Sequence, residues 1–387
     1  MEEWKEYKLG EVAEIVTGYP FPSEKYGATG KLRVVRGENV TIGKLRWDVE
    51  KHWNLDIAGL EKYLLRPDDI VIGMDGSRVG SNRALIRETD LPLILAQRVA
   101  CLRAKNGFDS KYIWYTIFSD TFRKYVEAIN TGTSIPHISQ KQIAEFEIMC
   151  PSEAEQKRIA RVLSSLDDKI DLLHRENATL EALAETLFRH YFIESPNPEW
   201  KESPLSTIAT FLNGLACQKY PPKDLINRLP VLKIKELSSG ITKDSDWATT
   251  DVGEEYIVHC GDVIFAWSAS LMVKMWNGED CVLNQHLFKV TSDIFPRWYY
   301  YLWCKYHLQE FISIAQSHAT TMGHIKRGDL DSAMVLVPSR NEMESFTKQI
   351  EPLLKRVETN YSQINNLSFY RDNLLLRLMS GEVKVDE

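Results

Sequence analysis

The sequence predicts an α+β protein in which two α/β domains, related by a pseudo-two-fold axis, are separated by two long helices that form an antiparallel coiled coil. Three observations predict this fold class. Four segments of the chain recur in the same order, a long helix follows each copy, and apolar side chains recur along both helices with heptad spacing. A chain of 387 residues, with 44% hydrophobic and 26% charged residues, is long enough for two or three domains of ordinary composition.

The internal repeat is carried by four pairs of segments. Residues 3–18 match residues 199–214 with seven identities in sixteen positions. Further along the chain, 66–77 match 259–270, 95–102 match 283–290, and 137–152 match 324–339. The offset only shrinks, from 196 to 187, and the order is kept. Chance resemblance between strands and turns would not keep this order, so we infer a duplication.

Each copy ends at a Pro-Ser pair, at 151–152 and at 338–339. We therefore predict a first domain over residues 1–150, a first long helix over 151–195, a second domain over 196–339 and a second long helix over 340–387. Short apolar runs punctuated by glycine and proline predict strands, and aromatic stretches predict helices. The predicted strands are 32–36, 70–73, 96–103, 231–234, 263–267 and 283–290, and the predicted aromatic helices are 112–129 and 298–314.

The long helices carry the seam of a coiled coil. Apolar residues fall at alternating intervals of four and three, which is the spacing of side chains that face a partner helix. The seam positions are Ile159, Leu163, Leu166, Ile170, Leu173, Asn177, Leu180 and Leu187 in the first helix, and Phe346, Ile350, Leu353, Val357, Asn360, Ile364, Leu367 and Leu374 in the second.

Each seam contains one asparagine, Asn177 and Asn360, near the middle of its helix. If the helices pair antiparallel with the domains at opposite ends, the two amides meet and fix the register, as a single buried asparagine does in other coiled coils. The alternative is that one or both point to water.

Motifs of common enzyme classes are missing from the sequence. It contains no GxGxxG or GxxxxGK[ST] phosphate loop, no HExxH or paired Cys/His spacing for zinc, no GxSxG elbow and no NPPY-like tetrad of an adenine methyltransferase. Asp69 and Asp262 are equivalent by the repeat and are interpreted as turn residues before a strand. A duplicated chain without a catalytic constellation is better interpreted as a bivalent binder than as an enzyme.

Charge and cysteine content limit the partners and the compartment. The net charge of −7 argues mildly against a nucleic-acid binder, but residues 1–150 hold 21 basic and 21 acidic side chains, so DNA contacts would use local clusters. The six cysteines form no CxxC pair and are interpreted as buried free thiols of a cytosolic protein. The first residues show no apolar run behind a basic start, so no signal peptide is expected. With no apolar stretch of membrane-spanning length, the sequence predicts a cytoplasmic protein without a membrane partner.

The two copies share short motifs that are typical of a known protein family. Each copy opens with Trp-Lys and a T-G or N-G turn, contains a D-D or G-D pair before an apolar strand, and closes with His-Ile followed by a proline thirteen positions later. Together with the alternating long helices, this pattern resembles the specificity (S) subunit of a type I restriction–modification system over essentially the whole chain.

The resemblance implies two target-recognition domains, each of which reads one half of a bipartite, asymmetric site in double-stranded DNA. It implies that the helices set the spacing and dock two methyltransferase (M) subunits, and that restriction/translocase (R) subunits join them. It also implies that this chain has no catalytic activity and holds no cofactor or metal. S-adenosylmethionine, ATP and magnesium are expected in the partner subunits.

Candidate DNA contacts are polar residues on loops, because arginine and lysine pair with guanine, asparagine and glutamine pair with adenine, and hydroxyl groups bind phosphate. In the first domain they are Arg33, Arg36, Asn39, Ser77, Arg78, Asn82, Arg83, Thr131, Thr133, Ser134, His137 and Lys141. In the second domain the repeat points to Asn213, Gln218, Lys219, Tyr220, Ser268, Ser270, Lys274, His318, Thr320, Thr321, His324, Lys326 and Arg327.

Some of these residues have an alternative interpretation. The alternative for each candidate loop residue is that it belongs to a plain surface turn. For His137 and His324 the alternative is a structural role, in which the imidazole makes its hydrogen bonds within the fold. Gln97 and Gln285, which lie inside predicted apolar strands, are expected to make buried structural hydrogen bonds. Four tryptophans are expected in the core: Trp47, Trp53, Trp267 and Trp276.

Two other functions stay open from the sequence. One is a protein–protein scaffold of another defence complex, without direct DNA reading. The other is a specificity module with the same DNA role in a different restriction or defence complex.

Overall fold

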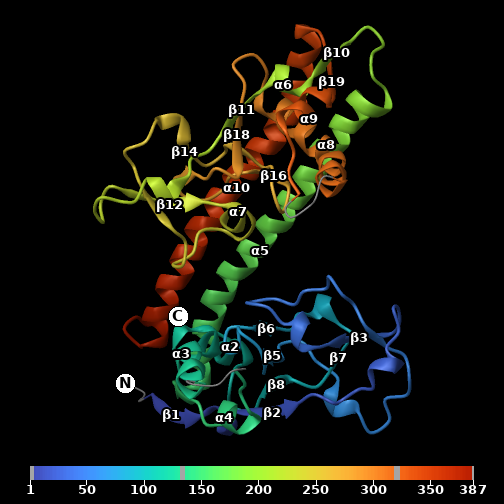
Figure 1. Ribbon diagram of the computed structural model, residues 1–387. Coiled ribbons are helices and arrows are strands. Elements are labelled where there is room, and N and C mark those ends of the chain that lie inside the picture. Colours follow the sequence, from blue (N-terminus) through green and yellow to red (C-terminus); the bar gives the residue numbers. More distant parts are fainter. Residues whose placement is uncertain (1–3, 131–135, 318–322, 386–387) are drawn as a thin grey trace. The chain divides into compact units, whose positions relative to one another are not determined.

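A computed structural model describes residues 4–130, 136–317 and 323–385 of the chain (Figure 1). Its tertiary contacts divide the chain into two compact units, Met1–Asp168 with Ser368–Glu387, and Lys169–Leu367. This division falls inside both long helices, so each helix belongs in part to each unit. The domain boundaries placed at the helix ends stay a prediction.

The first unit contains three small sheets. Strand β1 (Lys5–Lys8) pairs antiparallel with β9 (Glu147–Cys150). A four-stranded antiparallel sheet has the order β2 (Ala13–Thr17), β8 (Val99–Ala104), β5 (Ile70–Gly73), β6 (Arg83–Leu85). A third sheet has the order β4 (His52–Trp53), β3 (Leu32–Val35), β7 (Leu93–Leu95), in which β3 and β7 run parallel.

The second unit repeats these sheets. Strand β10 (Lys201–Pro204) pairs antiparallel with β19 (Met334–Val337). An antiparallel sheet has the order β11 (Thr210–Asn213), β18 (Leu287–Thr291), β15 (Val263–Ala266), β16 (Met272–Met275). The last sheet has the order β13 (Trp247–Thr249), β12 (Arg228–Leu232), β17 (Cys281–Leu283), β14 (Ile257–Val258), with β12 and β17 parallel. Strand order and direction thus confirm the duplication and the predicted α+β class.

Most helices occupy matching places in the two copies. Helix α1 (Leu9–Val12) corresponds to α6 (Leu205–Ile208), α2 (Ser110–Phe118) together with α3 (Asp120–Ile129) corresponds to α8 (Arg297–Ser317), and α4 (Gln140–Ala144) corresponds to α9 (Arg327–Ser332). Helix α7 (Ile234–Ser239) follows β12, where the first copy has a 3₁₀ turn (Gly37–Asn39) after β3. The aromatic helix predicted over 298–314 is confirmed as α8. The helix predicted over 112–129 is wrong as a single element, because the extended backbone of Ser119 separates α2 from α3.

Two predicted strands are also wrong as single elements. The run 96–103 contains a turn after β7, and only its second part belongs to β8. The run 283–290 divides in the same way between β17 and β18. In each copy this turn carries the chain from one sheet to another. The turn residues lie between buried apolar strands and include no glycine or proline, so composition did not show the break.

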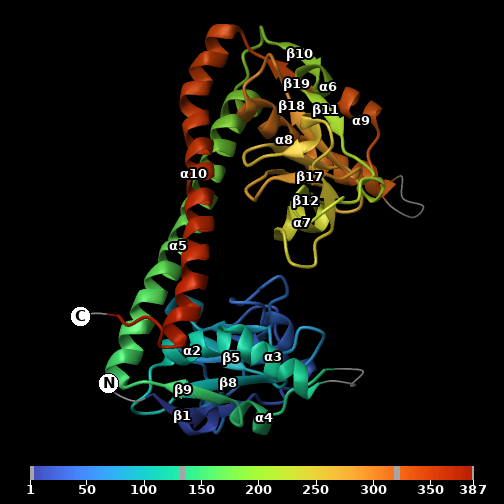
Figure 2. The same cartoon turned by 90° about the vertical axis from the view of Figure 1, so that its left-hand side faces the viewer.

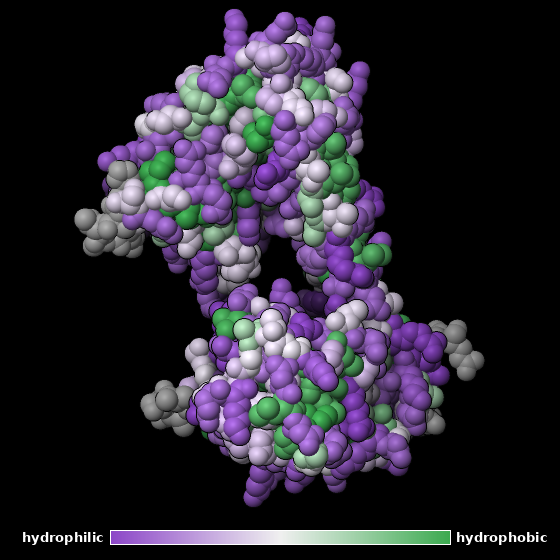
Figure 3. All heavy atoms as spheres, turned by 90° about the vertical axis from the view of Figure 1, so that its right-hand side faces the viewer, coloured by the Kyte–Doolittle hydropathy of each residue, from purple (hydrophilic) through white to green (hydrophobic). Residues whose placement is uncertain are grey.

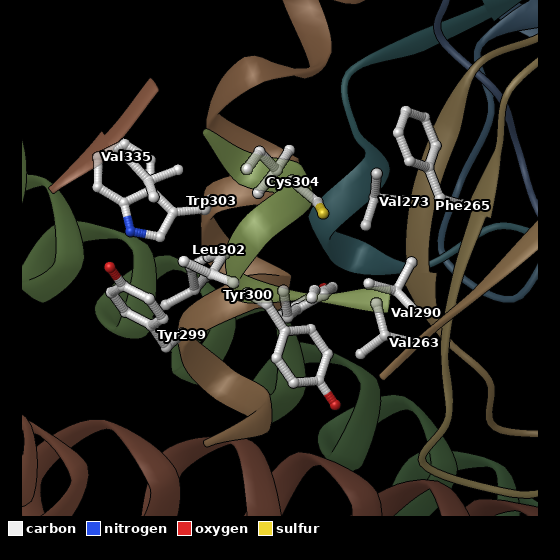
Figure 4. Packing of buried hydrophobic residues seen from close by; sticks show 14 of the residues in the cluster. Val263, Phe265, Val273, Val290, Tyr299, Tyr300, Leu302, Trp303, Cys304 and Val335 are labelled. Carbon is white, nitrogen blue, oxygen red and sulfur yellow. The ribbon is translucent and has the colours of Figure 1, made fainter. Parts of the chain in front are cut away.

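Hydrophobic cores hold the four-stranded antiparallel sheet of each unit against helices. In the second unit, aromatic residues of α8 pack on apolar side chains of β15, β16 and β18, and Figure 4 shows Tyr299 and Trp303 beside Val335 on one side of this cluster. In the first unit, side chains of α2 and α3, including Tyr112 and Phe122, pack on Ile70 and Ile72 of β5. Fully burying side chains of this size stabilises each domain by about 1.5–3 kcal/mol per residue.

The two long helices are α5 (Glu153–Arg189), which continues in a π-helical turn over His190–Glu194, and α10 (Arg340–Met379). Figure 2 shows them side by side. In the second unit they pair antiparallel, since Asn177 contacts Asn360 whereas Tyr191, later in α5, contacts Gln349, earlier in α10. In the first unit, Ile159 and Leu163 of α5 share a core with Leu375 and Leu378 of α10.

Three smaller expectations can be compared with the structure. Asp69 and Asp262 both accept a hydrogen bond from the backbone N–H three residues earlier, at 2.8 Å in each case, which confirms their turn role. All six cysteines are free thiols, but Cys260 is exposed, so the expectation that all are buried is wrong there. Within the described ranges, no helix combines the length and apolar character needed to cross a membrane.

Candidate nucleic-acid interface

Side chains from three separated segments of the first domain meet at one point of its surface. Asp75 follows β5, Arg98 lies in the turn between β7 and β8, and His137 precedes α4. Arg98 Nε lies 3.3 Å from one carboxylate oxygen of Asp75, and His137 Nδ1 contacts the other. Backbone bridging between Asp75 and His137 holds the segments together. We call these three residues the first cluster.

The second domain forms a cluster at the equivalent place. The backbone of Ser268, after β15, bridges to His324, as Asp75 bridges to His137. Ser268 Oγ lies 3.2 Å from His286 Nδ1, and Trp267 Nε1 donates to Asn213 Oδ1 at 3.2 Å. The Trp267 ring lies 6.0 Å from the His286 ring and 6.4 Å from that of His324. We call these five residues the second cluster.

The two clusters differ in chemistry although their backbones correspond. The first combines a guanidinium, a carboxylate and an imidazole, whereas the second combines two imidazoles, an indole, an amide and a hydroxyl. On the face of each unit that Figure 3 presents, hydrophilic residues predominate and hydrophobic residues form separate patches. Selective contacts with a nucleic acid would therefore come from particular side chains of this kind.

The sequence predicted only part of the clusters. His137, Asn213, Ser268 and His324 were candidates, but Asp75, Arg98, Trp267 and His286 were missed. The repeat could have identified Arg98 and His286, because Gln97-Arg98 of segment 95–102 aligns with Gln285-His286 of segment 283–290. Gln97 is exposed and Gln285 half-buried in a turn, so the expectation of buried amides inside strands is wrong. The prediction that four tryptophans lie in the core holds for Trp53 and Trp276, which are buried, whereas Trp47 and Trp267 are only half-buried.

Two predicted contacts have structural roles instead. Arg83 is 5% exposed, and its terminal nitrogens donate to the carbonyls of Gly80, Phe118 and Ser119, where it fills the break between α2 and α3. Burial lowers the pKa of Arg83 to about 10. Asn39 is also buried, and its amide group donates to the carbonyls of Arg46 and Val49. Because these polar groups serve the fold, both predictions of DNA contact are corrected.

The other described candidates of the first domain are at least partly accessible. Ser77, Arg78, His137 and Lys141 are exposed, and Asn82 is half-buried. Arg33 stacks on Trp47 at 4.4 Å, and Arg36 pairs with Glu38 at 2.6 Å. These side chains stay predicted DNA contacts.

The second domain offers a similar set. Asn213, Gln218, Lys219, Tyr220, Ser270, His324, Lys326 and Arg327 are exposed. Ser268 is buried and its hydroxyl contacts His286, and Lys274 Nζ donates to the carbonyls of Leu237 and Ser238 at the end of α7. Thr131, Thr133, Ser134, His318, Thr320 and Thr321 lie outside the described residues.

The seam asparagines meet in the second unit. Asn360 Nδ2 donates to Asn177 Oδ1 at 2.8 Å, and the two residues are 0% and 2% exposed. The alternative in which they point to water is therefore wrong. None of the predicted seam residues is exposed: Ile159, Leu163, Leu166, Ile170, Leu173, Asn177, Leu180, Leu187, Phe346, Ile350, Leu353, Val357, Asn360, Ile364, Leu367 and Leu374 are buried or half-buried.

Ion pairs flank this seam. Arg356 Nε lies 2.9 Å from Glu176 in the second unit. In the first unit, Arg371, which interrupts the apolar seam, lies 2.8 Å from Asp167, and the Tyr115 hydroxyl donates to the same carboxylate at 2.6 Å. The charge of Arg371 in the heptad pattern is thus paired with a carboxylate on the facing helix.

Comparisons with known proteins agree with this architecture. The family model of the type I restriction modification DNA specificity domain matches residues 1–182 and again 197–367. The chain is 26% identical over 323 residues to the type I restriction enzyme MjaIX specificity subunit of Methanocaldococcus jannaschii, covering 76% of this chain and 74% of that protein. It is 21% identical to the EcoBI specificity subunit of Escherichia coli, covering 98% and 85% of the two chains.

A solved structure shows the same fold. The crystal structure of a type I restriction-modification system S subunit from M. genitalium has a TM-score of 0.58 and 16% identity, and the match covers 100% of this chain and 97% of that one. Since the family model matches both copies and most of the chain, this protein belongs to the family of type I restriction–modification DNA specificity proteins.

Proposed function

We propose that this chain is the non-catalytic DNA specificity subunit of a type I restriction–modification complex, in which each domain reads one half of a bipartite, asymmetric site. One observation carries the proposal. Two domains with the same sheet order present different side chains at the equivalent surface cluster. Two domains that bind different half-sites in the same way need the same fold and different side chains at the contact surface.

The chemistry of the clusters suits base reading. An arginine fork matches O6 and N7 of guanine in the major groove, and amides of asparagine and glutamine match adenine. The first domain presents Arg98 and Arg78, while the second presents Asn213 and Gln218. The two half-sites therefore differ in sequence.

The paired helices serve as the spacer and as the dock for the methyltransferase subunits. Buried apolar seams, the Asn177–Asn360 contact and the flanking ion pairs support a spacer of fixed length. We propose two methyltransferase subunits, one near each half-site, together with restriction/translocase subunits. S-adenosylmethionine, ATP and magnesium are then bound by these partners, and the complex acts on DNA in the cytoplasm.

The methylated sequence of host DNA tests the proposal. A host that expresses the full system should carry one methylated motif made of two half-motifs with a constant gap. Replacing residues 1–150 by the first domain of another family member should change one half-motif only.

Two outcomes would contradict this reading. If both half-motifs changed, the modular assignment would be wrong. If the purified complex bound DNA without sequence preference, or not at all, a protein–protein scaffold of another defence complex would be the better description. DNA contacts through phosphates should also weaken steeply as salt is raised.

A further inference from the structure

Equivalent backbone hydrogen bonds hold the turns between β7 and β8 and between β17 and β18. Gln97 N donates to the carbonyl of Tyr19 at 2.9 Å, and Gln285 N donates to the carbonyl of Leu215 at 2.8 Å. Gly18 and Gly214 donate in the same way to Val99 and Leu287. Each turn is thus clamped by the segment that follows the first strand of the antiparallel sheet.

Gly18 and Gly214 lie so close to the backbone of the facing turn that neither can be replaced by a residue with a side chain. A Cβ on Gly18 would lie 2.0 Å from the carbonyl oxygen of Ala96, and a Cβ on Gly214 would lie 2.4 Å from that of Asn284. Both distances are far below van der Waals contact, so only glycine allows the backbones to approach. The duplicated glycine of the T-G and N-G turns therefore holds the equivalent turn in each domain.

The residue at the tip of this rigid turn differs between the copies. It is Arg98 in the first domain and His286 in the second, and both side chains are exposed. Arg98 has a φ of 66°, a left-handed conformation that non-glycine residues rarely adopt, whereas His286 is not among the residues with a positive φ. Its side chain is 72% exposed but is held through Nε by Asp75. The two terminal nitrogens of a guanidinium provide further N–H donors.

We infer that Arg98 and His286 are equivalent base-reading residues, and that Arg98 reads a guanine in the first half-site. This inference rests on the proposed DNA-reading function. The planar fork of Arg98 matches O6 and N7 of guanine, and Asp75 fixes its direction before DNA arrives. His286 contacts Ser268 through Nδ1 and lacks such a fork, so the equivalent position of the second domain reads its base differently.

The test uses the complex with its methyltransferase subunits and a library of duplexes randomised in both half-sites. Arg98→Ala should lower discrimination for guanine at one position of the first half-motif by about 5- to 150-fold and leave the second half-motif unchanged. Arg98→Lys keeps the charge without the fork and should relax the same position while retaining overall affinity. His286→Ala should alter one position of the second half-motif only.

Arg46→Ala is the matched control. The Arg46 side chain is 54% exposed and its Nε lies 3.2 Å from Asp48, so it reproduces the exposure and ion pair of Arg98 on a loop outside the first cluster and outside the long helices. This variant should leave both half-motifs unchanged. Thermal unfolding of each variant verifies that relaxed specificity does not come from a misfolded domain.

The outcomes separate this inference from the function on which it rests. If the wild-type complex selects a bipartite motif and Arg98→Ala keeps full guanine preference, the inference is overturned while the proposed function stands. If the wild-type complex selects no motif, the proposed function itself fails.

Discussion

Arg78 lies in the loop before β6 and Arg83 begins that strand five residues later, yet the two side chains have opposite environments. Arg78 is exposed, whereas the guanidinium of Arg83 is enclosed by Phe118 and Phe122 and bound to backbone carbonyls. Residue type alone suggested DNA contact for both. Burial assigns Arg83 to the fold and leaves Arg78 as a predicted contact.

Arg83→Ala should lower the free energy of unfolding by about 2–4 kcal/mol, because three carbonyl groups and a buried break between helices lose their partner. Arg78→Ala should change it by less than about 0.5 kcal/mol. Urea unfolding followed by circular dichroism measures both. Equal stabilities of the two variants would show that the Arg83 contacts contribute nothing to folding.

The seam asparagines can be tested as a pair. Asn177→Leu leaves the buried amide of Asn360 without its partner and should cost about 1–3 kcal/mol. The double variant Asn177→Leu with Asn360→Leu should recover most of that loss, because no polar group is left unsatisfied. A double-mutant cycle in urea measures the coupling, and additive losses would argue against an interaction between the two side chains.

At the scale of elements, the start of α10 shows how one side chain joins several segments. Glu342 accepts hydrogen bonds from the backbone and hydroxyl of Ser339, from the amide of Asn197 and from the Trp200 indole. The Ser339 hydroxyl first, and then the other donors, hold the pKa of Glu342 at about 2, below its ordinary value of 4.5. The contact with Ser339 is a capping box, and it ties the helix to the beginning of the second domain.

This shift predicts a pH dependence. The folded-state pKa lies below the unfolded one, so the stabilisation by Glu342 is complete above about pH 4.5 and is lost as the pH falls towards about 2. Glu342→Gln should therefore be less stable than wild type at pH 7, and the difference should disappear on acidification. Unfolding in urea at several pH values measures it, and a constant difference between the two proteins would contradict the assignment.

At the scale of the whole molecule, the proposed function depends on continuity of α5 and α10. Both helices contribute to both units, so their length bears on the gap between the half-sites. The overall charge of −7 does not favour DNA, so the proposed function relies on local groups and on partner subunits for contact with the duplex.

Inserting one heptad after Asp168 and another after Leu367 preserves the seam and adds about 10 Å to each helix at 1.5 Å per residue. At about 3.4 Å per base pair, the methylated motif should keep both halves and gain about three base pairs in its gap. Sequencing of methylated host DNA measures the gap. An insertion in α5 alone breaks the pairing and serves as the negative control, and an unchanged gap in the double insertion would refute the spacer role.

The candidate site was only partly predictable, for reasons visible in particular residues. Loop candidates such as Ser77 and His324 follow from their polar type and from the repeat. Arg98 and His286 did not, because their turns lie inside apolar runs that are typical of one continuous strand. Asp75 could not be connected with His137 from the sequence, since 62 residues separate them.

By itself, the sequence determined that the chain is duplicated, that two long heptad helices follow the copies, and that the family is that of DNA specificity proteins. Repeats and heptads are periodic along the chain, so they can be read without coordinates. Only the tertiary structure decided which polar side chains stay exposed, because the exposure of Arg98 and the burial of Arg83 depend on segments that are distant in sequence and adjacent in space.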